Sequence, residues 1–238
     1  MNIRLYYPNS IVENTTGLLS KDHTHYVVNV MRLKRGSNIN FFNKNGEWEG
    51  EIVFLEKDRV EVKFLKKIKT NQVTGLFNIE LAICLVKKTP METILQKATE
   101  LGVNKITPIV SDRTEVKELN YERAKKIVIE ATEQSSQFIP PEISKIIKLK
   151  DFLKNLEGST KLLFADVNSN YKLKSEDLKV SKSLCILIGP EGDFSPSERE
   201  LILGSLSVKP FTISKNILRS DTAVISAISL VNFINKFH

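Results

Sequence analysis

The sequence is poor in cysteine and has no long hydrophobic run. Its 238 residues include only two cysteines, Cys84 and Cys185, each inside a short apolar run. A thiol in such a run behaves as a small buried hydrophobe, so we expect no disulfide framework. The N-terminus lacks the apolar stretch of a signal peptide, and no run of about 18 apolar residues occurs. These absences predict a cytoplasmic protein with no membrane partner.

Two common nucleotide-binding signatures are also missing. No G-x-G-x-x-G follows a strand and no G-x-x-x-x-G-K-[ST] occurs, which argues against the usual dinucleotide-binding fold and against a P-loop. Metal chemistry has little support, because His23 and His25 have no cysteine near them in the sequence. We therefore expect no metal site.

The composition of the chain is that of a folded, basic protein. Hydrophobic residues make up 41% and charged residues 26% of the chain, an ordinary globular balance. The 35 basic residues exceed the 28 acidic ones, for a net charge of +7. Such a field favours a polyanion, and nucleic acid becomes the leading partner class. A net charge of this size also occurs in basic proteins that bind no nucleic acid. A metabolic α/β enzyme with a basic surface and ligand-binding glycine loops is therefore an alternative.

The first third of the chain has the pattern of a small antiparallel β-barrel. Strands are expected at residues 38–42, 48–55 and 59–65, with the first two joined by an Asn-Gly turn. In the third strand apolar and charged residues alternate, which gives it one buried face. Ahead of these strands, Ser20 is placed to cap a helix that runs to about Met31.

A polar segment ending in glycine, residues 70–75, predicts a domain boundary, so the first domain is 1–74 and the second 75–238. Beyond it, strands and helices alternate, as in an α/β domain. Strands are expected at 79–86 and 105–110, and helices from Pro90, with Thr89 as N-cap, and from Tyr121.

The most informative stretch is an apolar strand, 184–188, followed by Gly-Pro-Glu-Gly at 189–192 and by a helix cap made of Ser195, Pro196 and Glu198. Glycines let backbone approach a ligand closely, and open α/β sheets bind ligands at the carboxyl ends of their strands. An ordinary tight turn between a strand and a helix is the alternative interpretation.

A second loop, residues 212–220, also follows a strand and precedes a helix, so the two loops are candidates for one shared pocket. The helix after Asp221 is apolar round much of its circumference and must be covered on several sides. It is either a core helix or part of a subunit interface.

These motifs together resemble one known family. The matching segments are Gln96 to Gly102, Glu130 to Ser135, Gly189 to Ser195 and Ile217 to Ala223, with a further similarity at Arg32 to Gly36. They are similar, in order and across nearly the whole chain, to the signature segments of the ribosomal RNA small subunit methyltransferase E family.

The resemblance implies a SPOUT-type α/β domain with a C-terminal deep trefoil knot, preceded by a PUA-like β-barrel domain that binds RNA. It further implies a homodimer formed through the knotted domain, and methylation of uridine N3 in 16S ribosomal RNA of the small ribosomal subunit with S-adenosyl-L-methionine. The implied cofactor-binding residues are Phe164, Ala165, Ile188, Gly189, Pro190, Glu191, Gly192, Ile213, Ser214, Asn216, Ile217 and Leu218. Candidates for gripping RNA phosphates are Arg32, Lys34, Arg35, Lys66, Lys67 and Lys69.

The chain departs from the family pattern at four positions. The family usually has glycine where this chain has Asp193 and Ser214, and arginine where it has Asn216 and Gln137. These departures imply a tuned or weakened site. They keep open a non-catalytic RNA-binding or ribosome-assembly factor that retains the fold.

Methylation at uracil N3 requires loss of a proton, either to a general base or through stabilisation of the deprotonated ring by positive charge. Arg219 is our candidate for the electrostatic role, and an ion pair with Asp221 is its structural alternative. The sequence assigns no base.

Overall fold

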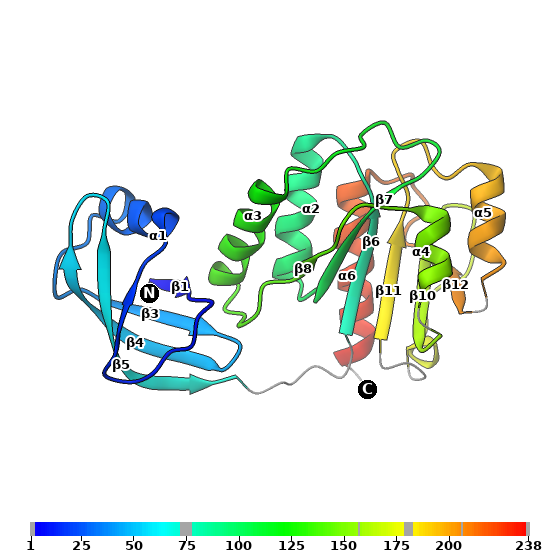
Figure 1. Ribbon diagram of the computed structural model, residues 1–238. Helices are drawn as coiled ribbons and strands as arrows, with labels where there is room; N and C mark the ends of the chain where they lie inside the picture. Colours follow the sequence, from blue (N-terminus) through cyan, green and yellow to red (C-terminus); the bar gives the residue numbers. More distant parts are fainter. Residues whose placement is uncertain (1–2, 72–77, 157, 179–182, 206, 237–238) are drawn as a thin grey trace. The chain divides into compact units, whose positions relative to one another are not determined.

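The computed structural model describes residues 3–71, 78–156, 158–178, 183–205 and 207–236 (Figure 1). The chain forms two compact units, one of residues 1–74 with 132–139 and the other of residues 75–131 with 140–238. The boundary expected at 70–75 lies mostly outside the described residues.

The first unit is a five-stranded sheet in the order β1-β3-β4-β5-β2. Its strands are β1 (Arg4–Tyr6), β2 (Thr16–Leu18), β3 (Asn38–Asn43), β4 (Gly46–Leu55) and β5 (Val60–Thr70). The three predicted strands are confirmed, whereas β1 and β2 were missed because three residues are too few to show a period. The all-antiparallel expectation is wrong for β1, which pairs in parallel with β3. The long connection between the two strands permits this pairing.

Strand β5 extends five residues past its predicted end at residue 65. The extension pairs with the start of β4, from Lys66 opposite Glu49 to Thr70 opposite Gly46, with bulges in the ladder. Its residues are exposed, so it lacks the alternating burial by which a sequence reveals a strand.

The helix capped by Ser20 is confirmed but changes geometry. Ser20 accepts a hydrogen bond from the His23 amide, and α1 (Lys21–His25) then continues as one π-helical turn, Tyr26–Val30. Met31 follows as the C-cap, so the end predicted from the sequence is close to the observed one.

A buried arginine joins the sheet of the first unit to residues 132–139. The guanidinium of Arg4 lies 3.5 Å from the Phe42 ring centroid, pairs with Glu47 at 2.9 Å and donates to the Gln137 carbonyl at 2.6 Å. The Arg4 and Glu47 side chains are 10% and 11% exposed. Arg4 binds the main-chain carbonyl of Gln137, so this contact does not depend on which side chain residue 137 carries.

The second unit is a parallel sheet in the order β12-β10-β11-β6-β7-β8, with β9 also pairing with β7. Its strands are β6 (Asn78–Cys84), β7 (Lys105–Val110), β8 (Glu142–Ile143), β9 (Ile147–Lys148), β10 (Thr160–Ala165), β11 (Ser183–Ile188) and β12 (Val208–Phe211). Its helices are α2 (Lys88–Glu100), α3 (Tyr121–Gln134, of which residues 132–134 belong to the first unit), α4 (Leu149–Asn155), α5 (Pro196–Leu203) and α6 (Ser220–Lys236), with a short 3₁₀ turn at Ser175–Asp177. The α/β prediction is confirmed.

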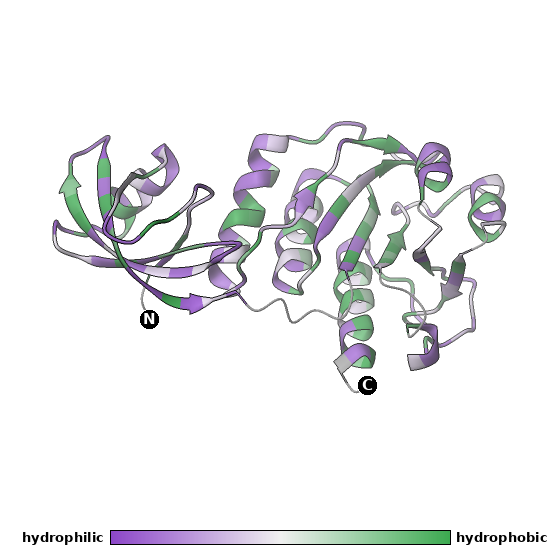
Figure 2. Ribbon diagram, turned by 60° about the horizontal axis from the view of Figure 1, so that its bottom comes forward, coloured by the Kyte–Doolittle hydropathy of each residue, from purple (hydrophilic) through white to green (hydrophobic). Residues whose placement is uncertain are grey.

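Both faces of this sheet are buried, as parallel sheets require. On β11, Leu184, Ile186 and Ile188 pack into a core shared with α2, α3 and α6. Cys185 and Leu187 point to the opposite face, where α4 and α5 pack. The central strands and α6 are accordingly hydrophobic along most of their length (Figure 2). Both cysteines are free and buried, as expected, and burial raises the pKa of the Cys84 thiol to about 12.

One predicted helix start is wrong. Helix α2 begins at Lys88 with Lys87 as N-cap, so Thr89 lies inside the first turn and does not cap it. The Met91 amide bonds to the Lys87 carbonyl at 3.0 Å, which closes the turn two residues earlier than predicted. Pro90 is tolerated at the third helical position because an amide there has no partner within the helix.

No described helix is long and apolar enough to cross a membrane. Within the same residues, no group of three or more His, Cys, Asp and Glu side chains is arranged to hold a metal ion.

Replacing Arg4 by alanine is expected to destabilise the first unit by about 3 kcal/mol, because Glu47 would remain buried without its charge partner. Trp48 is the only tryptophan and belongs to this unit, so its fluorescence during urea denaturation reports the change. The control is Arg59→Ala, which removes an exposed pair with Glu61 and should cost at most about 0.5 kcal/mol. Equal losses in the two variants would contradict the role given to Arg4.

Candidate functional site

The glycine loop that follows β11 lies at the carboxyl edge of the parallel sheet. Gly189 is closely packed, because a Cβ there would lie 3.0 Å from the Phe194 ring, which would have to shift by a few tenths of an ångström. Ser195 and Glu198 then form the predicted capping box of α5, with the Ser195 hydroxyl accepting from the Glu198 amide and the Glu198 carboxylate accepting from the Ser195 amide. The loop is therefore anchored at both ends.

A neighbouring loop, the one after β7, also holds this segment in place. Arg113 donates from Nη1 to the Gly192 carbonyl at 2.9 Å. The Asp112 amide donates to Glu198 at 2.8 Å, and the Ser195 hydroxyl donates to the Asp112 carboxylate at 2.7 Å. Asp112 and Arg113 were missed in the sequence, since no local motif marks them. Their place after a strand of the same parallel sheet was the available signal.

Asp193, one of the departures from the family pattern, has a left-handed backbone with φ of 60°. Aspartate is one of the few residues besides glycine that adopt this conformation readily. Its carboxylate accepts a hydrogen bond from the Phe194 amide at 2.8 Å, and its own amide bonds to the Pro190 carbonyl at 3.0 Å. The loop therefore retains its turn without the glycine.

The second loop, residues 212–219, has its own internal hydrogen bonds. The Ser214 hydroxyl accepts from the Asn216 amide at 3.0 Å, and the Thr212 hydroxyl donates to the Ser214 carbonyl at 3.1 Å. Ser214 has no positive φ, so this position does not need glycine. A long contact of 3.5 Å from the Ser220 hydroxyl to the Gly189 carbonyl brings the two loops together.

The residues expected to bind the cofactor fall into two groups. Phe164, Ile188 and Pro190 are buried. The others are partly or fully exposed around the two loops: Ala165, Gly189, Glu191, Gly192, Ile213, Ser214, Asn216, Ile217 and Leu218. The structure therefore gathers these residues at one edge of the sheet, next to the ends of β10, β11 and β12.

Arg219 stands directly before α6, and its side chain is exposed. Among the described residues Arg219 forms no ion pair with Asp221, whose carboxylate accepts hydrogen bonds from the Thr222 amide and hydroxyl.

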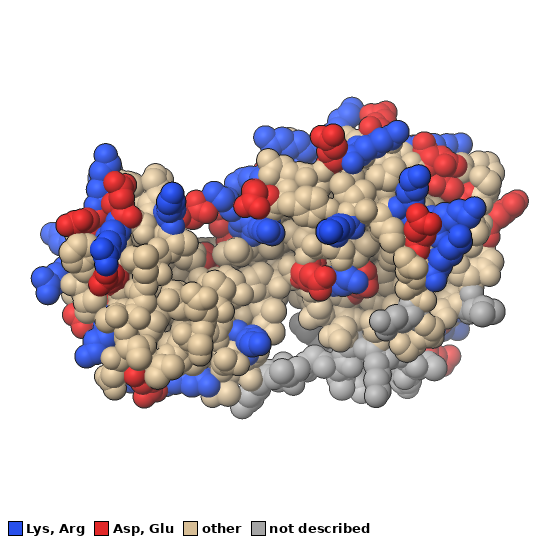
Figure 3. All heavy atoms as spheres, in the orientation of Figure 1, with Lys and Arg blue, Asp and Glu red and all other residues tan. Residues whose placement is uncertain are grey.

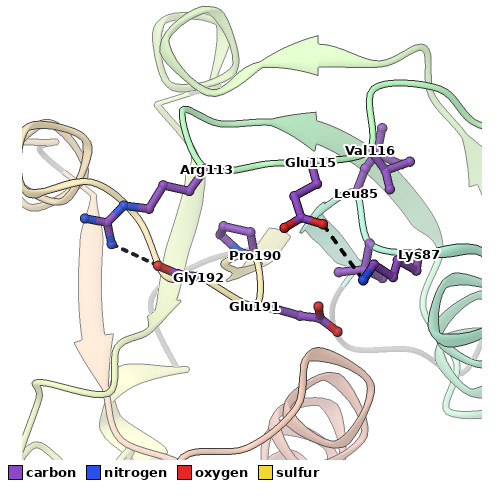
Figure 4. Close-up of a pocket in the computed structure, with 9 residues that line it drawn as sticks. Leu85, Lys87, Arg113, Glu115, Val116, Pro190, Glu191 and Gly192 are labelled. Carbon is purple, nitrogen blue, oxygen red and sulfur yellow. Dashed lines mark hydrogen bonds and ion pairs between the residues drawn. The ribbon is translucent and has the colours of Figure 1, made fainter.

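A hollow of about 370 Å³, including open solvent, adjoins the glycine loop (Figure 4). Its lining residues are Leu85, Val86, Lys87, Arg113, Glu115, Val116, Pro190, Glu191 and Gly192. Only the last three belong to the glycine loop, and the others follow β6 or β7. The sequence prediction missed this side of the loop.

The six basic residues expected to bind RNA all belong to the first unit, but the structure separates them. Arg32, Lys34 and Arg35 are exposed in a segment whose end, Gly36, bonds to Ile52 of β4. The other three, Lys66, Lys67 and Lys69, lie on β5 opposite the start of β4, about four residues or roughly 13 Å away along the strand.

Two of the lysines on β5 lie over aromatic rings. Lys67 lies 5.1 Å from the Trp48 ring and Lys69 lies 5.4 Å from the Phe138 ring, whereas Lys66 pairs with Glu49 at 3.5 Å. On the face drawn in Figure 3, basic and acidic side chains are interspersed and form no single basic field.

Comparisons with known proteins agree with this architecture. Residues 74–232 match the family described as RNA methyltransferase domain, and residues 19–65 match RNA methyltransferase PUA domain. A methyltransferase of Legionella pneumophila, solved with bound SAM, superposes with a TM-score of 0.87 at 29% identity over 98% of both chains. The fold and the loop site thus define an α/β RNA methyltransferase with a PUA-type domain.

The full-length relatives make the assignment narrower. Ribosomal RNA small subunit methyltransferase E of Rickettsia conorii is 34% identical over 98% of this chain and 96% of its own length. The enzyme of the same name from Neisseria gonorrhoeae, solved bound to S-adenosyl methionine, has a TM-score of 0.87 at 28% identity over 98% of both chains. The chain belongs to the ribosomal RNA small subunit methyltransferase E family.

Two uncharged substitutions of Asp193 isolate the contribution of its left-handed backbone to stability. Asp193→Ala should lower the free energy of unfolding by about 1 kcal/mol, because alanine keeps the left-handed strain and loses the bond to Phe194. Asp193→Gly should be as stable as the parent within about 0.5 kcal/mol, since glycine removes the strain. Urea denaturation followed by circular dichroism measures both, and equal stability of the two variants would exclude a strained backbone here.

A buried carboxylate ties the segment after β10 to β12. Asp177 accepts from the Tyr171 hydroxyl at 2.8 Å and the Lys174 amide at 2.9 Å, and lies 3.4 Å from the Lys209 ammonium. Burial by itself would raise the pKa of Asp177, but these hydrogen bonds and the nearby ammonium outweigh it and lower the pKa below its ordinary value.

Because this pKa is lowered on folding, Asp177 stabilises the protein above the ordinary aspartate pKa of about 4, and the contribution is lost as the pH falls through the lowered value. Asp177→Asn should therefore cost about 1–2 kcal/mol at pH 7 and progressively less below about pH 4. Denaturation monitored by circular dichroism at a series of pH values checks this. A constant difference at all pH values would exclude the titration of Asp177 as its cause.

Proposed function

We propose that the protein transfers a methyl group from S-adenosyl-L-methionine to N3 of a specific uridine in 16S ribosomal RNA. The observation that carries the proposal is the anchored Gly189–Gly192 loop at the carboxyl end of β11, in a chain that belongs to this methyltransferase family. The relatives from Legionella and Neisseria are solved with the same methyl donor.

The residues present fit this cofactor. Gly189 and Gly192 have no side chains, so a ligand can approach their backbone amides and carbonyls closely. Ile213 and Leu218 are partly exposed and supply apolar surface for an adenine ring, with Ile188 buried at the end of β11. We infer that these groups, with Phe164, Ala165, Pro190, Glu191, Gly192, Ser214, Asn216 and Ile217, hold the cofactor, which supplies an electrophilic methyl group on a sulfonium.

The protein contributes mainly alignment and electrostatics to such a transfer. Arg219 is free of the Asp221 ion pair and stands beside the second loop, so its positive charge is available to stabilise the ring that has lost its N3 proton. This supports the electrostatic role that we propose for Arg219.

The first unit is proposed to bind the RNA. Its match to a PUA domain of RNA methyltransferases supports this, as do the exposed cations Arg32, Lys34, Arg35, Lys66, Lys67 and Lys69. Uridine N3 is hidden in paired or stacked RNA, so the nucleotide must be presented unpaired or flipped out. The same proposal includes a homodimer that forms through the domain of residues 75–238. It also includes action in the cytoplasm.

We further infer a trefoil knot at the C-terminal end of the sheet. The segment after β10 and the segment after β12 are hydrogen-bonded, from the Thr212 amide to the Tyr171 carbonyl at 2.8 Å, and β12 pairs directly with β10. Such closeness between the two segments supports a threaded arrangement, a rare exception to the usual topology.

Calorimetric titration with S-adenosylmethionine tests the cofactor proposal. Saturable binding by the parent is expected, with affinity at least about tenfold weaker in Gly189→Val, because the added side chain presses on the Phe194 ring and covers the backbone of the loop. Gly158→Val is the matched control, since a Cβ there meets nothing within 4 Å. No binding by the folded parent would overturn the proposal in favour of an RNA-binding factor that keeps the fold.

A further inference from the structure

The loop that follows β10 begins with a buried carboxylate, that of Asp166. This residue comes directly after Phe164 and Ala165, which are proposed to contact the cofactor, and its side chain is only 2% exposed. A charged side chain is seldom buried so deeply without partners, because it has lost its hydration. The partners of Asp166 therefore show which segments its carboxylate holds together.

Asp166 has partners on three segments of the second unit. Its amide donates to the carbonyl of Phe211, the last residue of β12, at 3.0 Å. Its carboxylate accepts from the Asn168 amide at 3.0 Å, within the same loop. From α5, Arg199 donates to both carboxylate oxygens, from Nη2 at 2.7 Å and from Nε at 3.4 Å. One residue thus connects the loop after β10, the end of β12 and helix α5.

These same segments carry or adjoin the residues proposed to bind the cofactor. Ala165 precedes Asp166, residues 213–218 follow the end of β12, and α5 is the helix that the glycine loop enters. The Arg199 amide bonds to the Ser195 carbonyl at 2.9 Å, so the arginine stands close behind the cap of α5. Helix α5 packs over β10 and β12 (Figure 1). A shift of this helix against the end of β10 would therefore move two walls of the proposed site apart.

We propose that Arg199 and Asp166 are a positioning pair for the cofactor. By fastening the start of α5 to the end of β10, they set the spacing between the glycine loop and the loop after β10, and with it the affinity for S-adenosylmethionine. In this proposal neither side chain touches the cofactor. The proposal rests on the methyl donor proposed above and adds a determinant of its affinity outside the lining of the site.

Apolar packing alone leaves this spacing less well defined. An edge-to-face contact joins β10 to the glycine loop, with the rings of Phe164 and Phe194 5.7 Å apart. Such ring pairs are favourable over a range of roughly 4.5–7 Å, so the contact permits sliding. Two hydrogen bonds from one guanidinium to one carboxylate fix both distance and direction. The polar pair is therefore the more precise of the two connections.

Arginine has the geometry that this pair requires. Its planar fork presents two donors to the two oxygens of Asp166, whereas the single ammonium of a lysine cannot form a side-by-side pair. The hydrogen bond to Asp166 raises the pKa of the Arg199 guanidinium, desolvation opposes the rise, and the charges of Asp166 and Asp193 add to it. Arg199 therefore stays protonated at neutral pH.

Calorimetric titration of the full chain with S-adenosylmethionine tests the proposal. Arg199→Met keeps most of the stem but removes the fork, and its affinity should be about tenfold or more weaker than that of the parent. Arg199→Lys keeps the charge without the fork and should lose about threefold. The matched control is Arg123→Met, which removes a more exposed pair with Glu92 and should bind within about twofold of the parent.

Urea denaturation of the same variants separates positioning from a purely structural role. Loss of the pair also lowers the stability of the protein, so affinities are compared without denaturant, where circular dichroism shows each variant to be folded. A purely structural pair would lower the stability of Arg199→Met and leave its affinity within about twofold of the parent. That result would overturn the positioning role.

A double-mutant cycle tests whether Arg199 acts through Asp166. Asp166→Asn should also bind about tenfold more weakly, and the double variant should bind no more than about twofold more weakly than Arg199→Met alone. Losses that multiply to about a hundredfold would show that the two residues act independently, which contradicts a pair. If Asp166→Asn does not fold, the methionine and lysine variants of Arg199 decide the matter.

The parent protein distinguishes failure of this inference from failure of the proposed function. A folded parent that does not bind S-adenosylmethionine would refute the proposed function, and the positioning pair with it. A parent that binds, together with an Arg199→Met variant of equal affinity, would refute the positioning pair alone.

Discussion

The parallel pairing of β11 between β10 and β6 is the constraint on which the rest of the catalytic unit depends. Its register sets Leu187 opposite Phe164 and Ile188 opposite Ile83, so three strands end at one edge of the sheet. The glycine loop, the proposed cofactor residues and the hollow all begin there. Burial of both faces of β11 fixes this register, since a shift of one residue would exchange its two apolar faces between different cores.

The glycine loop owes its shape as much to its neighbours as to its own residues. Arg113 and Asp112 hold it from the loop after β7, and Ser220 contacts it from the start of α6. These contacts explain how the loop tolerates Asp193 in a left-handed conformation that favours glycine. A turn held from outside accepts the modest strain of a left-handed aspartate, which also forms a local hydrogen bond.

The first unit shows a different way of ordering a small domain. Its core combines aliphatic side chains with packed aromatic rings, of which Phe41 and Phe64 lie 5.5 Å apart. Arg4 connects the sheet to residues 132–139 through the Phe138 ring and the Gln137 carbonyl. Such a polar connection fixes geometry as well as stability, because every partner of Arg4 is directional. The surface lysines beside Trp48 and Phe138 are then presented by a rigid support.

The sequence by itself determined the α/β pattern of the second unit, the capping box at Ser195, the burial of both cysteines and the family, because these depend on local periodicity and short motifs. It misplaced the start of α2 and missed β1, β2 and the end of β5, where short or exposed segments carry no period. Only the tertiary structure brought Lys87, Arg113 and Glu191 to one hollow. Residues so far apart in the chain meet because parallel strands carry their carboxyl ends to the same edge, and this pairing is a property of the sheet and not of any segment.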